Sequence, residues 1–177
     1  MLKKILACSN HIKNLIWTKL SPINYAKHLG VNLGENVTFY AMKPGMFSTE
    51  PWLITIGSNC YITANCQFIT HDGGTLILRK EQPDLELTAP ITIGNDVYIG
   101  LNSTILAGSK IGNRCIIGAG SVVKGDFPDN SVIAGVPARV IKTVDEYFEK
   151  AKKNSLKLGH LDAKSKEIEL KKYYNIK

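Results

Sequence analysis

The chain has 177 residues, of which 44% are hydrophobic, and this is enough for one domain with a sizeable core. No apolar run approaches the roughly 20 residues of a membrane span, and the first residues lack the features of a signal peptide. The net charge of +7 suits an anionic partner, but no nucleic-acid-binding motif accompanies it, so we expect no nucleic-acid partner.

Apolar residues at helical spacing mark the first 30 residues. They are Leu2, Ile5, Leu6, Ile12, Leu15 and Ile16. Lysines occupy the other side of this pattern, which predicts an amphipathic helix that is broken by Pro22. We expect residues 1–30 to form a helical cap over the open end of a repeat structure. A second interpretation places this segment on a membrane surface as a peripheral contact.

From residue 93 onward an aliphatic residue returns every six positions. The series is Ile93, Ile99, Ile105, Ile111, Ile117 and Val123, with an earlier run at Ile56, Ile62 and Phe68. A period of six fits neither a helix nor a single strand and is typical of a parallel β-helix, in which short strands turn corners and coils stack. Small residues four positions later, among them Cys60, Cys66 and Cys115, are expected to fit beneath the wall as reduced thiols. Reduced thiols indicate a cytoplasmic protein.

Three hexads make one triangular coil, with glycine and asparagine at the corners. Looser matches extend the repeat at both ends, so the β-helix domain is expected over residues 31–142. We predict a mainly β fold, a parallel β-helix of about five coils with an N-terminal helix and two C-terminal helices.

Residues 143–177 leave the repeat and are predicted to be helical. Residues 143–146 have the pattern of a capping box, which predicts a helix through about residue 153. Gly159 separates it from a second helix, for which Asp162 is the expected N-cap.

The repeat stops at Phe68 and resumes at residue 91, which leaves a long loop over residues 73–90. A loop of this length inside a compact repeat is usually functional. His71 stands where the chain leaves the wall, and a histidine suits a general base that takes a proton from a hydroxyl or an amine. A surface or packing role is the alternative for an isolated histidine, and the loop beside it favours catalysis.

Several stretches resemble the hexapeptide-repeat acetyltransferases, in the branch that acetylates maltose, galactosides and polysaccharides. They are Thr70-His71, residues 91–100, residues 117–123 and residues 134–141. The resemblance covers residues 31–142 and implies a left-handed β-helix that works as a homotrimer, with active sites at the subunit interfaces. It implies transfer of acetyl from acetyl-CoA to a saccharide hydroxyl during surface-polysaccharide biosynthesis, with no metal required.

The resemblance also implies roles for individual residues. His71 would be the base of a direct transfer in a ternary complex, and the Leu101 N–H, next to Gly100, would stabilise the oxyanion. The amides of Leu101 and Ala119 would face the pantetheine arm. Lys124 would also belong to the coenzyme site. Arg139 and Lys142 would bind the CoA phosphates.

Some residues depart from the family pattern. Tyr98 stands in place of a tryptophan, Lys124 lies one place from the usual lysine, and Asp72 replaces a proline. Asp72 is expected to orient the imidazole, to bind a sugar hydroxyl or merely to turn the loop. No asparagine matches the family's acceptor-binding residue near residues 43–51. We expect the non-repeating residues 42–52 to form the acceptor wall, with Trp52 stacked on a sugar or simply packed.

Alternatives to saccharide O-acetylation use another acceptor, other chemistry or no catalysis. N-acetylation of an amino sugar, or acetylation of an antibiotic or of serine, would use the same base and donor site with another small-molecule acceptor. A zinc carbonic anhydrase would need three converging histidines, and His71 alone lies in the regular coils. A non-catalytic scaffold is disfavoured because the loop, His71 and residues 135–139 occur together.

Overall fold

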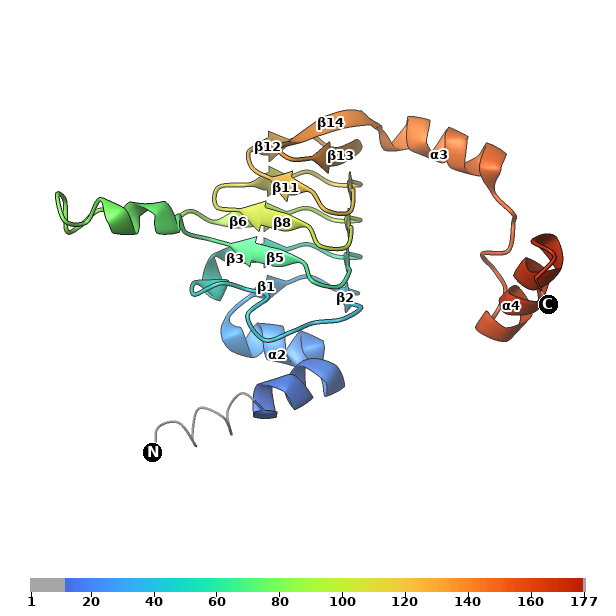
Figure 1. Cartoon of the computed structure of the whole chain (residues 1–177), viewed down its shortest axis with the longest axis horizontal. Coiled ribbons are helices and arrows are strands. Elements are labelled where there is room, and N and C mark those ends of the chain that lie inside the picture. Colours follow the sequence, from blue (N-terminus) through green and yellow to red (C-terminus); the bar gives the residue numbers. More distant parts are fainter. Residues whose placement is uncertain (1–11, 177) are drawn as a thin grey trace. The chain divides into compact units, whose positions relative to one another are not determined.

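The computed structural model describes residues 12–176. The chain divides into two compact units, Met1–Val144 and Asp145–Lys177. The first unit is built of short strands in three sheets, and the second is helical (Figure 1). Within residues 12–176 no helix combines the length and the apolar character needed to cross a bilayer.

The strands of the first unit form three sheets, named A, B and C here. Sheet A has the order β1 (Asn32–Leu33), β3 (Ile54–Ile56), β6 (Ile91–Ile93), β9 (Lys110–Ile111) and β12 (Asp126–Phe127). Sheet B has β14 (Ala138–Thr143), β13 (Ser131–Gly135), β10 (Ile116–Ile117), β7 (Tyr98–Ile99), β4 (Tyr61–Ile62) and β2 (Thr38–Phe39). Sheet C has β11 (Val122–Val123), β8 (Thr104–Leu106) and β5 (Gln67–Ile69).

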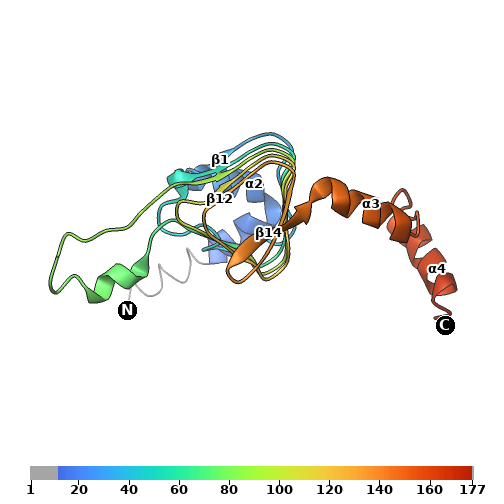
Figure 2. The ribbon, with the colours of Figure 1, turned by 90° about the horizontal axis from the view of Figure 1, so that it is seen from above.

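From β3 to β13, consecutive strands belong to sheets A, B and C in turn, so the chain coils around a three-sided prism (Figures 1 and 2). Neighbouring coils pair in parallel, with Ile93 opposite Ile111 and Ile117 opposite Ile99. Each partner is three hexads along the chain, as the repeat predicts. Ile56 pairs with Ile93 although the loop 73–90 lies between them, so the loop is an insertion that leaves the stack in register.

The inward positions of the strands make the core. Every aliphatic residue of the hexad series is buried, as are the small residues at the fourth position: Val97, Ser103, Ser109, Cys115 and Ser121. The serine hydroxyls bond to carbonyl oxygens under the wall, for example Ser103 Oγ to Gly118 O at 3.0 Å. Cys60, Cys66 and Cys115 are free and buried, and burial raises the pKa of each thiol. The prediction of space-filling thiols is confirmed.

Asparagines at the corners tie one coil to the next. Asn59, Asn65 and Asn102 adopt left-handed backbone angles, with φ of 57°, 59° and 60°. The Asn65 Nδ2 donates to Asn102 Oδ1 at 3.0 Å, and Asn59 Nδ2 donates to Asp96 Oδ1 at 3.1 Å. Gly57 is needed because a Cβ there would lie 2.5 Å from the Gly94 carbonyl oxygen of the next coil. Corners therefore require small or αL-tolerant residues.

Helices cover the N-terminal end of the prism. Residues 12–20 are helical, and α2 (Pro22–Leu29) follows with Pro22 in its first turn. The single N-terminal helix of the prediction is therefore two, because proline can start a helix but not continue one. Tyr25 and Ala26 of α2 are buried in the core of the first coil. The part of the expected cap at residues 1–11 lies outside the described residues.

At the other end of the stack, β13 and β14 form an antiparallel pair. The second unit contains α3 (Val144–Asn154) and α4 (Ala163–Tyr173). Asp162 caps α4 as expected, since its side chain accepts from the Lys164 and Ser165 amides. There are also two short 3₁₀ helices: η1 (Pro51–Leu53) directly precedes β3, and η2 (Gly73–Ile77) lies in the loop 73–90.

Replacing Ile93 with alanine should lower the free energy of unfolding by about 2–5 kcal/mol, because the shortened side chain leaves a cavity in the core. Thr92 is the outward-facing neighbour on the same strand, and Thr92→Ala should change it by less than about 0.5 kcal/mol. Urea denaturation followed by circular dichroism measures both values. Equal effects would contradict the inward and outward alternation.

Candidate active site

His71 stands at the edge of the prism, two residues beyond β5. The chain leaves the coil there and returns through an antiparallel bridge between His71 and Thr88. The Asp72 N–H donates to Leu87 O at 2.8 Å, and the Ala89 N–H donates to Thr70 O at 2.9 Å. These bonds close the neck of the loop that projects from the stack (Figures 1 and 2), so His71 is held although the loop is long.

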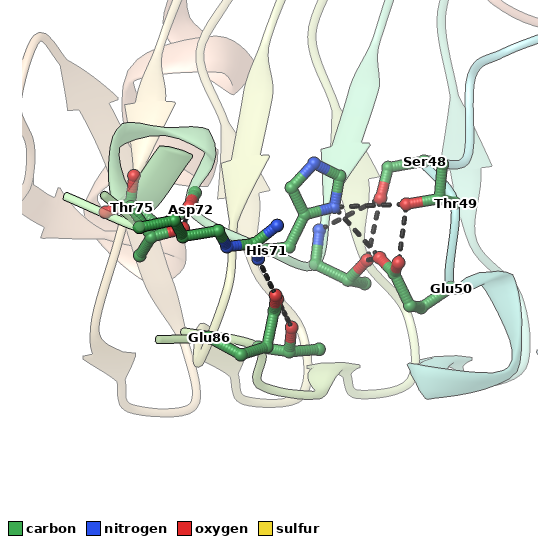
Figure 3. A network of polar contacts seen from close by, with 10 residues as sticks. Ser48, Thr49, Glu50, His71, Asp72, Thr75 and Glu86 are labelled. Atoms are coloured by element: carbon green, nitrogen blue, oxygen red, sulfur yellow. Dashed lines mark hydrogen bonds and ion pairs between the residues drawn. The ribbon is translucent and has the colours of Figure 1, made fainter. Parts of the chain in front are cut away.

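Glu50, from the preceding coil, is the partner of the imidazole. Its Oε2 lies 2.9 Å from His71 Nδ1 and accepts from Thr70 Oγ1 at 2.7 Å. Thr49 Oγ1 donates to Glu50 Oε1 and lies 3.2 Å from His71 Nδ1. Ser48 Oγ lies 2.7 Å from Thr70 Oγ1 and completes the network (Figure 3).

The charge of Glu50 determines which nitrogen of His71 is basic. Hydrogen bonds from Thr49, Thr70 and His71 lower the pKa of the Glu50 carboxyl from 4.5 to about 2. Glu50 is therefore a carboxylate at neutral pH, and a carboxylate can only accept. The His71 Nδ1 then carries the proton, and the lone pair of the neutral ring is on Nε2. The network orients a base whose Nε2 has no partner within residues 12–176.

Sequence reasoning missed Glu50. It lies in residues 42–52, which carry no hexad and were expected to form an acceptor wall. A signal exists in the pairing of coils, because Phe47 bridges Phe68 in parallel and the same offset takes Glu50 to His71. That offset is longer than three hexads and is set by the non-repeating segment, so the hexad pattern cannot supply it.

Two cavities share His71 in their linings. One, of about 220 Å³, is lined mainly by polar side chains: Thr49, Glu50, His71, Asp72, Gly73, Thr75, Leu76, Arg79 and Glu86. The other, of about 260 Å³, has fewer polar side chains in its lining: Ile69, His71, Asp72, Gly73, Leu106, Ala107 and Lys124. We call them the polar and the apolar cavity. His71, Asp72 and Gly73 line both, so groups bound in the two cavities would lie close to His71.

The loop side of the polar cavity is held by Arg79. Its Nε donates to Leu85 O at 2.9 Å, and its Nη2 pairs with Glu86. Glu86 also accepts from Thr88 Oγ1 at 2.6 Å. Asp72 accepts from the Gly74 N–H at 2.9 Å and thereby caps η2. The contact that orients the imidazole comes from Glu50, while Asp72 turns the loop and contributes to both cavities.

Trp52 lies away from these cavities. It is 64% exposed in η1, and its Cβ would be 3.3 Å from a Cβ at Gly30, the residue that ends α2. Its position within this chain is therefore next to the N-terminal helices. It is not among the residues that line either cavity.

The residues expected to bind the coenzyme fall into separate groups. Lys124 is on the His71 side, in the apolar cavity. Gly100, Leu101 and Ala119 form a column at the opposite end of sheet C, where the Gly120 N–H donates to Leu101 O at 2.7 Å. Leu101 precedes β8 and His71 follows β5, and these strands are parallel and in register. One chain therefore does not bring His71 and Leu101 together.

The last two expected coenzyme residues, Arg139 and Lys142, lie on β14 at the C-terminal end of the stack. Arg139 is exposed, and its Nη1 donates to Ala138 O at 2.8 Å. Among the described residues no group of three or more His, Cys, Asp or Glu side chains is placed to hold a metal ion.

The Glu50 network generates a prediction about stability and pH. Because the pKa of Glu50 falls to about 2 on folding, its ionised form stabilises the native state fully above pH 4.5, and this contribution is lost as the pH falls toward 2. The difference in unfolding free energy between the wild type and Glu50→Gln should therefore be largest near neutral pH and shrink over this range. Chemical denaturation at several pH values measures it.

Glu81→Gln, which alters an exposed carboxylate in the loop 73–90 outside the network, is the matched control. A difference between wild type and Glu50→Gln that stays constant from neutral pH down to pH 2 would contradict the network as drawn in Figure 3.

Comparisons with known proteins agree with the hexad repeat. A family profile described as bacterial transferase hexapeptide (six repeats) matches residues 90–125. The chain is 43% identical to Protein CapG of Staphylococcus aureus over 144 residues, which are 81% of this chain and 84% of that protein. It is 36% identical to galactoside O-acetyltransferase of Escherichia coli (strain K12) over 126 residues, or 71% of this chain and 60% of the relative.

A solved structure shares the fold. The hexapeptide-repeat acetyltransferase VCA0836 of Vibrio cholerae, complexed with acetyl coenzyme A, superposes with a TM-score of 0.56 at 25% identity. The match covers 76% of this chain and 85% of that one. With its repeat, its inserted loop and relatives that match over most of their length, this chain belongs to the hexapeptide-repeat acetyltransferases.

Proposed function

We propose that this protein transfers acetyl from acetyl-CoA directly to a hydroxyl group of a saccharide, with His71 as general base. The observation that carries the proposal is that Glu50 holds the imidazole of His71, a residue that lines both cavities. The galactoside O-acetyltransferase among the relatives supports a saccharide hydroxyl as acceptor, and the acetyl coenzyme A complex of the Vibrio cholerae protein supports the donor.

The chemistry follows from the tautomer of His71. The acceptor hydroxyl donates to Nε2, and its oxygen attacks the thioester carbonyl as the proton moves to the ring. Glu50 stabilises the imidazolium that forms, since its carboxylate lies 2.9 Å from Nδ1. Collapse of the tetrahedral intermediate breaks the carbon–sulfur bond, and the proton passes from Nε2 to the CoA thiolate. The base returns to its starting state without a covalent enzyme intermediate.

The two cavities suit different substrates. We assign the acceptor to the polar cavity, where Thr49, Asp72 and the Arg79–Glu86 pair offer hydrogen-bonding groups. Its carboxylates outnumber its one arginine, which favours an uncharged saccharide over an anionic one. We assign the acetyl end of the donor to the apolar cavity, where Lys124 offers a positive charge to a coenzyme that is an anion.

A second chain is needed to complete this site. The outward residues of β5 and β8 carry no charge: Gln67, Ile69, Thr104 and Leu106. Sheet A, by contrast, presents Lys110 and Asp126. We therefore propose a homotrimer in which sheets C face the threefold axis, so that His71 of one copy meets Leu101 and Ala119 of the next. The Leu101 N–H then serves as oxyanion donor, and Arg139 and Lys142 bind the CoA phosphates.

Further parts of the assignment are also proposals. We infer a left-handed coil with about five turns, as the family relationship and the five-stranded sheet A support. We place the reaction in the cytoplasm, in the assembly of a surface polysaccharide, since acetyl-CoA is an intracellular donor. N-acetylation of an amino sugar is the alternative, because the base would accept an amine in the same position.

Replacing His71 with alanine should lower kcat by roughly 10²–10⁴-fold, because the acceptor hydroxyl loses its general base. A thiol reagent that detects free CoA measures the rate, with a panel of neutral, amino and acidic sugars as acceptors and mass spectrometry of the products. His160→Ala, which changes an exposed histidine outside the site, should retain activity. Turnover of His71→Ala near the wild-type rate would refute the assigned base.

Mixed oligomers test the shared site. Ala119→Trp should block the donor groove, because Ala119 is exposed on the face assigned to the coenzyme. Each of His71→Ala and Ala119→Trp alone should be inactive, whereas trimers assembled randomly from an equal mixture should regain roughly a quarter of wild-type activity. Recovery is expected because about a quarter of the interfaces combine an intact His71 from one copy with an intact Ala119 from the next. Absence of recovery, in mixtures that gel filtration shows to be trimeric, would place the site within one chain.

A further inference from the structure

The helix at residues 12–20 exposes apolar side chains on a face where a helix in contact with water normally carries polar ones. One side carries the exposed residues Ile12, Leu15, Ile16 and Leu20, and Ile16 and Leu20 are 52% and 80% exposed. The opposite side carries Trp17, which packs against the core cluster, and Thr18, which is buried. Exposed apolar residues on one helix face, in a row of this length, indicate a surface that binds something.

A hollow adjoins this helix face and shares its apolar character. It has a volume of about 530 Å³ and lies between residues 15–22 and residues 39–44. Its lining includes Phe39, Tyr40 and Met42, together with Lys19 and Lys43. Tyr40 is also exposed, at 65%, and a tyrosine suits a boundary between apolar and polar surroundings. The helix face and the hollow together form what we call the end face.

The charge around the end face indicates the chemistry of the surface that it binds. Residues 12–43 contain four lysines, Lys13, Lys19, Lys27 and Lys43, and a single acidic residue, Glu35. Lys19 projects among the exposed apolar residues of the helix, and Lys13 lies at their edge. A helix with exposed apolar residues and interspersed lysines has the chemistry of a segment that lies in the interface of an anionic bilayer. A protein partner with an apolar surface would not require this ring of lysines.

The position of the helix is also suited to a flat surface. Helix 12–20 is the last described element at the N-terminal end of the stack, beyond α2 (Figure 1). Nothing in the described part of this unit extends past it. The N-terminal end of the prism would then contact the membrane, and the prism axis would point away from the membrane surface.

We propose that the end face docks this protein on the surface of an anionic phospholipid bilayer. Ile12, Ile16 and Leu20 insert among the acyl chains near the headgroups, and Lys13, Lys19 and Lys43 pair with lipid phosphates. The contact is peripheral, reversible and sensitive to salt. In the trimer proposed above, three parallel copies would present this face to the same side, and binding would gain from multivalency.

Co-sedimentation of the full-length protein with lipid vesicles tests the proposal. It should bind vesicles of phosphatidylglycerol and phosphatidylcholine, bind pure phosphatidylcholine at least roughly tenfold more weakly, and be released when NaCl is raised to about 0.5 M. The double variant Ile16→Asn/Leu20→Asn should weaken binding to the anionic vesicles by at least about tenfold. Ile168→Asn, which alters an equally exposed isoleucine on α4, should bind as the wild type does.

A second variant keeps the test independent of folding. Lys13→Glu/Lys19→Glu changes two exposed side chains, should leave thermal unfolding unchanged, and should weaken binding to anionic vesicles by at least about tenfold. Equal binding by all variants would overturn the proposal, as would absence of binding to anionic vesicles. An assembly larger than a trimer that dissociates in Ile16→Asn/Leu20→Asn, seen by light scattering, would assign the end face to a second copy instead and also overturn it.

Discussion

The structure depends on the stacking of identical coils. Each coil is too thin to bury a core of its own. Its backbone groups therefore form hydrogen bonds to the coils above and below, and its inward aliphatic residues pack against those of the same coils. Pairs such as Ile99 with Ile117 show this directly, since each strand bonds in parallel to a strand one coil away. The requirement repeats at every rung, and it forces the same side-chain sizes at the same positions: aliphatic inside, small beneath the wall, asparagine or glycine at the corner.

A stack of this kind holds in place the segments that interrupt the repeat. The segment 42–52 and the loop 73–90 leave the wall in neighbouring coils and at the same edge, where Phe47 still pairs with Phe68. The stack therefore fixes the backbones that carry Glu50 and His71, and a short network of hydroxyls completes the geometry. The side chains at this edge are therefore positioned by coils that hydrogen-bond to one another in parallel.

The stacking of coils also requires that both ends of the prism are covered, and the two covers differ. A stack of strands exposes unpaired backbone groups at each end, so it needs a cover. At the C-terminal end β14 pairs antiparallel with β13, and at the N-terminal end α2 buries Tyr25 and Ala26 on the first coil. Helix 12–20 packs on this end through Trp17, and the apolar residues of its other side remain exposed. His71 lies in the second coil, so a bilayer at this end would be only a few coil spacings from the site.

The hexad period alone predicts the three-sided stack, and its interruption predicts the position of the loop. The interruption also singles out His71, whose role as a base stays a prediction, as does the second chain that the resemblance implies. The stacked coils are needed to show that Glu50 holds the imidazole and that Trp52 lies beside Gly30. In both contacts the separation of the two residues along the chain is set by the non-repeating residues 42–52. No periodic signal encodes such a separation, so it becomes visible only when the coils are stacked.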